Sequence, residues 1–144
     1  MKRVQAGAVI EAFKRFKDIQ PAKGSFFQKD KKGNCYACGL GILAYSKGAR
    51  EYKKGSFDEL VYKMLVSKAD ETADVCGNYQ DGYSTGWDET DAEIKTARDL
   101  LGDLLQLGPD PGYEARIAGI DDGERDRLAI EGRIHSGRGL ERIA

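Results

Sequence analysis

Charge is distributed very unevenly along this chain of 144 residues. Residues 1–54 carry 13 basic and 4 acidic side chains, residues 55–115 carry 4 and 14, and residues 116–144 carry 6 of each. The net charge of −1 therefore combines a basic segment of +9, an acidic segment of −10 and a neutral end. Since opposite charges attract over about 8–10 Å in salt solution, we expect the first two segments to pack together. The pattern excludes both a uniformly basic nucleic-acid binder and a uniformly acidic mimic.

Apolar residues recur at helical spacing near the N-terminus. Val9, Phe13 and Phe16 share one face of a helix that is predicted to run through Ile19. Pro21 is expected to stop it, because proline lacks a backbone N–H donor. Two short apolar and aromatic runs follow on either side of a polar turn that ends in glycine, which predicts a β-hairpin at about residues 25–37.

Two capping boxes mark further helices. Ser56, with Glu59 three residues later, is predicted to start a helix that continues through Ala69, Ala73 and Cys76 and stops at Gly77. Thr90, with Glu93 three residues later, is predicted to start a second helix, which Gly108 and Pro109 end.

The composition changes after this helix. The Asp110-Pro111-Gly112 stretch is typical of a linker, and all six basic residues beyond position 115 are arginine. Asp121 or Asp122 would cap a last helix with only a thin apolar stripe. The predicted fold is therefore mainly α (α+β). It comprises a compact helical domain with one β-hairpin over residues 1–108, and a linker with a weakly packed C-terminal helical appendage over 109–144.

Cysteine and histidine raise two hypotheses. Cys35, Cys38, Cys76 and His135 are the residue types of a structural zinc site, although only the first two have paired spacing. A cysteine-dependent enzyme would need His135 as its base, but no Asn or Asp follows to orient the ring. We therefore expect cysteines that pack as small buried side chains, no cofactor and no catalytic residues. Zinc stabilisation or cysteine catalysis is the alternative.

An aromatic and glycine-rich stretch follows. Tyr79, Tyr83 and Trp87 are four residues apart, as are Gly82 and Gly86. On a helix this spacing places an aromatic ridge beside a glycine groove that another backbone can approach closely. Two interpretations stay open, a binding surface for a partner or packing inside the core.

Lysines of the basic segment form another candidate site. Lys29, Lys31, Lys32, Lys53 and Lys54 are interleaved with aromatic residues in the basic segment. Lysine can contact phosphates while rings stack on bases, so this mixture suggests single-stranded nucleic acid as an alternative partner.

The hairpin and the motif after it resemble a known kind of domain. An Asp30-x-x-Gly33 turn is followed by Cys38-Gly39-Leu40-Gly41-Ile42-Leu43 and then by a capped helix. Over residues 5–107 the chain resembles a small uncharacterised domain of bacteria and phages that has the signature Cys-Ala-x-Gly-Ala-Leu after a hairpin. It departs from this signature at Gly39 and Ile42. The resemblance implies a small, mainly helical domain, often on mobile elements, with no established activity.

These observations together predict a non-enzymatic binding or interaction protein of bacterial, phage or mobile-element origin. Its partner is expected to be another protein or a second copy of the chain. No apolar run reaches the roughly 18 residues of a membrane span, and no signal peptide is visible, so a cytoplasmic location and no membrane partner are expected.

Overall fold

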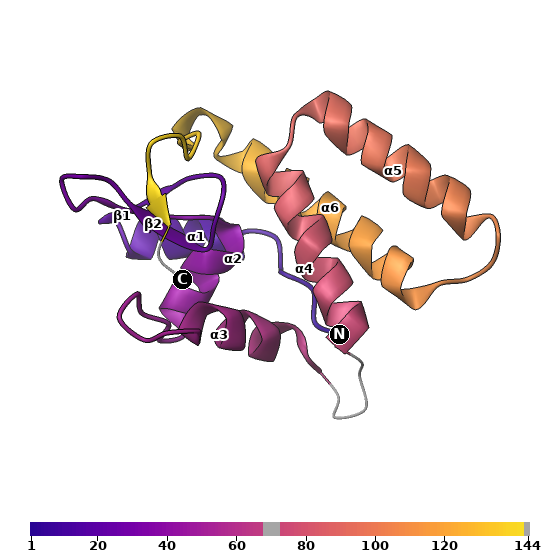
Figure 1. Ribbon diagram of the computed structural model, residues 1–144, viewed down its shortest axis with the longest axis horizontal. Helices are drawn as coiled ribbons and strands as arrows, with labels where there is room; N and C mark the ends of the chain where they lie inside the picture. Colours follow the sequence, from indigo (N-terminus) through magenta and orange to yellow (C-terminus); the bar gives the residue numbers. More distant parts are fainter. Residues whose placement is uncertain (68–72, 143–144) are drawn as a thin grey trace.

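The computed structural model describes residues 1–67 and 73–142, and its described part holds six α-helices and four short strands (Figure 1). The mainly helical fold with a hairpin is confirmed. The helices are α1 (Ala8–Arg15), α2 (Gly39–Ser46), α3 (Ser56–Leu65), α4 (Ala73–Asp88), α5 (Asp91–Leu105) and α6 (Pro111–Ala129). The strands are β1 (Ile19–Pro21), β2 (Phe27–Lys29), β3 (Cys35–Ala37) and β4 (Glu141–Arg142). None of the described helices is long and apolar enough to cross a membrane.

The strands form one small mixed sheet in the order β1-β3-β2-β4. Strands β2 and β3 are the predicted hairpin, with Phe27 opposite Ala37. Strand β1 runs parallel to β3, so the prediction of a helix through Ile19 is wrong: α1 ends at Arg15, and Ile19 is instead the buried first residue of β1. Pro21 fits β1 because this strand lies at the sheet edge, where a missing N–H donor is tolerated.

The hairpin turn is organised by Asp30. Its carboxylate accepts hydrogen bonds from the backbone N–H of Lys32 (2.9 Å), from the backbone and side-chain amides of Asn34 (3.0 and 2.9 Å) and from the Tyr36 hydroxyl (3.0 Å). These bonds favour the ionised carboxylate. They lower the pKa of Asp30 to about 2, and the bond from the Asn34 side chain has the largest effect.

Helix α2 lies in the middle of the N-terminal core. It packs among α1, α3 and the sheet, and its Leu40, Ile42 and Ala44 are fully buried. Its first turn must lie against the chain before β2, since a Cβ on Gly41 would collide with the carbonyl of Phe26. The Gly-Leu-Gly sequence is therefore a packing requirement.

Helices α4 and α6 lie in direct backbone contact, side by side in Figure 1. A Cβ on Gly82 would collide with the carbonyl of Arg116, and one on Gly86 with the carbonyl of Ile120. The reciprocal pair, Gly119 and Gly123, lies against the carbonyls of Tyr79 and Tyr83. Residue numbers rise together along this contact, so the two helices run parallel. We call these four glycines the glycine interface.

Helices α4 and α6 correct three expectations. Gly77, predicted as a helix stop, lies inside α4. The predicted linker is the start of α6, where the Asp110 side chain accepts the N–H of Tyr113 (3.1 Å) and Pro111 occupies the first turn. Residues 109–144 were expected to pack weakly, but α6 packs through glycine and polar side chains, which no apolar stripe reveals.

The two capping boxes have different outcomes. Thr90 caps α5, since its hydroxyl accepts the N–H of Glu93 (3.2 Å), as predicted. Ser56 does not cap α3: Gly55 is the cap residue, and the Ser56 hydroxyl bonds to the backbone of Arg50. The predicted continuation of this helix through Ala73 and Cys76 is wrong, because α3 ends at Leu65, Val66 is extended, and both residues belong to the separate helix α4. Ala69 lies outside the described residues.

The glycine interface is tested by adding one methyl group. We predict that Gly119→Ala lowers the free energy of unfolding by about 2–3 kcal/mol, because the helices must separate to admit the Cβ. Gly77→Ala is the control on α4, where a Cβ meets nothing within 4 Å, and it should raise stability by up to about 1 kcal/mol. Urea denaturation measures both changes, and equal effects of the two substitutions would contradict the interface.

The carboxylate of Asp30 supplies a pH-dependent prediction. Folding lowers the pKa of Asp30 from 3.8 to about 2. Its contribution to the stability of the fold is therefore present above pH 3.8 and is lost as the pH falls toward about 2. As the pH is lowered through this range, the free energy of unfolding of the parent chain should fall more than that of the Asp30→Asn variant. Parallel pH profiles for the two proteins would show that the turn does not depend on the charge.

Candidate functional site

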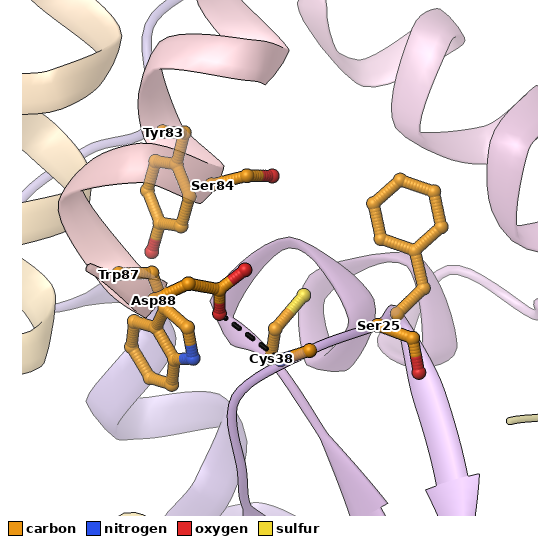
Figure 2. Close-up of a pocket in the computed structure, with 8 residues that line it drawn as sticks. Ser25, Cys38, Tyr83, Ser84, Trp87 and Asp88 are labelled. Atoms are coloured by element: carbon orange, nitrogen blue, oxygen red, sulfur yellow. Dashed lines mark hydrogen bonds between the residues drawn. The ribbon is translucent and has the colours of Figure 1, made fainter. Parts of the chain in front are cut away.

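One hollow lies where the C-terminal end of α4 meets the start of α2. Its volume is about 250 Å³. Figure 2 shows Cys38, Ser84 and Asp88 around it, with Tyr83 and Trp87 behind. We call this the α4-end pocket, and it is lined by Gly24, Ser25, Phe26, Cys38, Tyr83, Ser84, Trp87 and Asp88.

The polar groups of the α4-end pocket join two parts of the chain. The indole N–H of Trp87 donates to the carbonyl of Ala22 (2.9 Å), and the Asp88 carboxylate accepts the backbone N–H of Gly24 (3.0 Å; Figure 2). Both bonds hold the segment between β1 and β2 against the last turn of α4. These side chains therefore have a structural task.

Cys38 serves as a helix cap. Its Sγ accepts the N–H of Gly41 (3.4 Å) at the start of α2. Burial raises the pKa of the Cys38 thiol to about 12, so the sulfur is a neutral thiol near pH 7. A neutral thiol is a poor nucleophile and a poor metal ligand, which argues against cysteine catalysis at this position.

The candidate zinc ligands do not come together. Among residues 1–67 and 73–142, no group of three or more His, Cys, Asp or Glu side chains is placed to hold a metal ion. Cys35 lies on β3 with its thiol toward the carbonyl of Gly33, while Cys38 turns toward α2. Cys76 is buried on α4, and His135 packs its ring against Tyr36 at 4.9 Å. The four residues therefore do not form the zinc site of the hypothesis. Cys35 lies on a strand and Cys38 caps a helix, so the two thiols are directed to different neighbours.

The aromatic ridge faces inward. Tyr79, Tyr83 and Trp87 are at most 1% exposed. The Tyr79 hydroxyl donates to Asp122 (2.6 Å) and accepts the N–H of Val4 (2.8 Å), and the Tyr83 hydroxyl donates to Asp126 (2.7 Å). Gly82 and Gly86 do receive a close backbone, that of α6. A partner would have to displace α6 to reach Gly82 and Gly86. Tyr83 and Trp87, although buried, also border the α4-end pocket.

Two buried carboxylates on α6 were missed by the sequence analysis. Asp122 pairs with Arg3 (2.8 Å), and Arg125 bonds both to Asp122 (3.2 Å) and to Asp126 (3.0 Å). Burial raises the pKa of Asp126, a cost that its partners offset. The signal was present in the spacing, since the two aspartates are four residues apart, like Tyr79 and Tyr83.

A second, larger hollow of about 700 Å³ lies between the N-terminal segment, α2 and α3. Leu43, Leu60 and Met64 supply partly buried apolar surface. Every charged residue that lines it is basic. We call this the basic groove, and its lining consists of Lys2, Arg3, Val4, Gln5, Ala8, Leu43, Ser46, Lys47, Leu60, Lys63, Met64 and Leu65.

Two of the four cations in the groove have partners. Arg3 pairs with Asp122, and Lys63 with Glu59 (2.8 Å). Lys2 and Lys47 make no ion pair with any residue that the structure describes. The groove therefore keeps positive charge that the chain itself does not neutralise.

The acidic segment finds its counter-charges in α6. Asp81 pairs with Arg116 (3.5 Å) and Asp91 with Arg127 (2.8 Å). Within the described part of the chain, Arg3 is the basic side chain of residues 1–54 that forms an ion pair outside this segment. The basic and acidic segments do pack together, as α2 against α3 and Phe13 against Trp87 show, but among the described residues no side-chain ion pair joins them.

The five lysines proposed to contact nucleic acid are all exposed. Lys29 ends β2, Lys31 and Lys32 lie in the hairpin turn, and Lys53 and Lys54 precede α3; none of them lines the basic groove. Of the aromatic residues near them, Phe27 and Tyr36 are buried and Tyr52 is exposed.

Comparisons with protein-family models, with curated proteins and with solved structures found no match to this chain. The resemblance to an uncharacterised bacterial and phage domain therefore stays a prediction, and the function must be argued from the site itself.

The three thiols supply a test of the site geometry. At about pH 8, iodoacetamide should modify the half-buried Cys35 of the native protein first. Burial raises the pKa of all three thiols, but Cys38 and Cys76 are also closed off from the reagent, so they should react only after unfolding. Peptide mass mapping reads out each site. Modification of native Cys38 as fast as Cys35 would contradict the capping role.

Proposed function

We propose that this protein is a non-enzymatic binding protein that takes up an acidic, amphipathic segment of another protein in the basic groove. The observation that carries the proposal is the combination of an apolar floor, formed by Leu43, Leu60 and Met64, with charged residues of one sign.

The two parts of the groove suit the two faces of such a segment. Leucine-type side chains of an amphipathic helix would cover the apolar floor. Carboxylates along its edge would meet Lys2 and Lys47, whose long aliphatic stems can pack while their amines stay hydrated. Charge complementarity of this kind speeds association and selects acidic partners.

The groove is a better site for protein than for nucleic acid. Binding of single strands relies on aromatic rings on which bases stack, together with cations that follow the phosphates. The lining of the basic groove contains cations but no aromatic ring. The neutral, helix-capping thiol of Cys38 also supports binding over cysteine catalysis.

A labelled synthetic helical peptide with leucine on one face and glutamate along its edges tests the proposal. Fluorescence anisotropy should show binding at low salt that weakens as salt is added. Lys2→Glu combined with Lys47→Glu should weaken binding by about tenfold or more, since both side chains face the peptide. Lys31→Glu with Lys32→Glu is the control, with the same charge change in the hairpin turn, and should bind like the parent chain.

Two results would overturn the proposal. One is an acidic peptide that does not bind, or that binds both double variants equally. The other is a single-stranded oligonucleotide that binds in place of the peptide and loses affinity only in the Lys31 and Lys32 variant. This second result would make the hairpin lysines a nucleic-acid site.

A further inference from the structure

Helix α5 presents an acidic and apolar outer face. Leu100 is 59% exposed, and Leu107, just beyond the end of the helix, is 86% exposed. Asp99 and Asp103 are also exposed and lie on the same side of the helix as Leu100, because residues three and four apart are neighbours. This face is an amphipathic segment of the kind proposed above for the basic groove.

We propose that the outer face of α5 in one copy of the chain docks in the basic groove of a second copy. The inference rests on the proposed function of the groove and names its partner. The occupant matches in sign, since Asp99 and Asp103 would meet Lys2 and Lys47, and in polarity, since Leu100 would meet Leu60 and Met64.

The geometry of one molecule makes this a contact between copies. Helix α5 packs on α6 at the outer edge of the molecule, whereas the groove lies beside α3 and the N-terminal segment, with α4 and α6 in between (Figure 1). While Ile94 and Leu101 of α5 stay packed against Ile120 of α6, the outer face of α5 points away from the groove of its own chain. The two surfaces are different, so the contact is heterologous, and a bound pair still offers one free groove and one free α5.

The charges on α5 are available to a partner. Asp103 forms no ion pair with any described residue. Asp99 pairs with Lys95 at 2.8 Å, but both side chains are more than half exposed. Exposed pairs of this type contribute little, so Asp99 can exchange its partner at small cost.

Sedimentation velocity at increasing protein concentration is the first test. At low salt, the weight-average mass should rise past that of a dimer, because heterologous contacts do not close after two copies. High salt should return the protein to monomers, since the contact depends on exposed charges.

Complementary variants make the test specific. Lys2→Glu with Lys47→Glu blocks the groove, and Asp99→Asn with Asp103→Asn removes the acidic charges of α5, so each double variant alone should be monomeric. Mixed together, they retain one intact groove and one intact α5, and should form a 1:1 complex that stops at two chains. Lys31→Glu with Lys32→Glu should still assemble like the parent chain. All of these positions are exposed, and circular dichroism checks that each variant folds.

The outcomes separate this inference from the proposed function. If the chain stays monomeric at low salt while the synthetic acidic peptide binds the groove, the second-copy inference is wrong and the proposed function stands. If neither peptide nor second copy binds, both are wrong. Assembly without a 1:1 complex in the mixture would show that copies meet through other surfaces, and would also overturn the inference.

Discussion

The contact between the backbones of α4 and α6 is the constraint on which the rest of the structure depends. Gly82 and Gly86 on one helix and Gly119 and Gly123 on the other allow carbonyl groups where side chains would normally separate the helices. At this distance the hydroxyls of Tyr79 and Tyr83 reach the carboxylates of α6. A buried carboxylate is costly unless it is paired, so the close approach is also what makes Asp122 and Asp126 acceptable in the interior.

The same contact decides which charges remain at the surface. Helix α6 brings arginines beside the acidic segment, so that Asp81 and Asp91 are paired locally. The basic N-terminal segment gains little of this compensation, and Lys2 and Lys47 stay beside the apolar floor of the basic groove. The acidic segment is thus paired within the molecule, by arginines of α6, whereas the basic segment keeps lysines without an ion pair to any described residue in the groove that we propose for an acidic partner.

The sequence predicts the parts of the fold that follow local rules. Thr90 predicts the start of α5, and the turn around Asp30 predicts the hairpin, because both depend on hydrogen bonds between residues close in sequence. The pairing of β1 with β3 depends on a longer connection and was not predicted. Helix α6 was underestimated because it buries glycine, aspartate and Arg127, residues that a search for apolar periodicity treats as exposed.

The candidate sites differ in the same way. The glycine groove of α4 was recognisable from the four-residue spacing of Gly82 and Gly86, but its occupant could not be read from α4 alone. The paired spacing of Cys35 and Cys38 suggested that both bind one metal ion. The chain changes from strand to helix between them, so their thiols are directed to different neighbours. The basic groove is assembled from three separate segments, so no local motif marks it in the sequence.

Native-state hydrogen exchange of α4 and α6 tests the central claim most directly. Amides that open only in global unfolding form the slowest class, and helices that share a backbone contact should open together. We expect the middle turns of α4 and α6 to belong to this class and to respond equally to added denaturant. Exchange of α6 at a much lower opening free energy than α4 would show that α6 is an independent appendage, and would contradict the account.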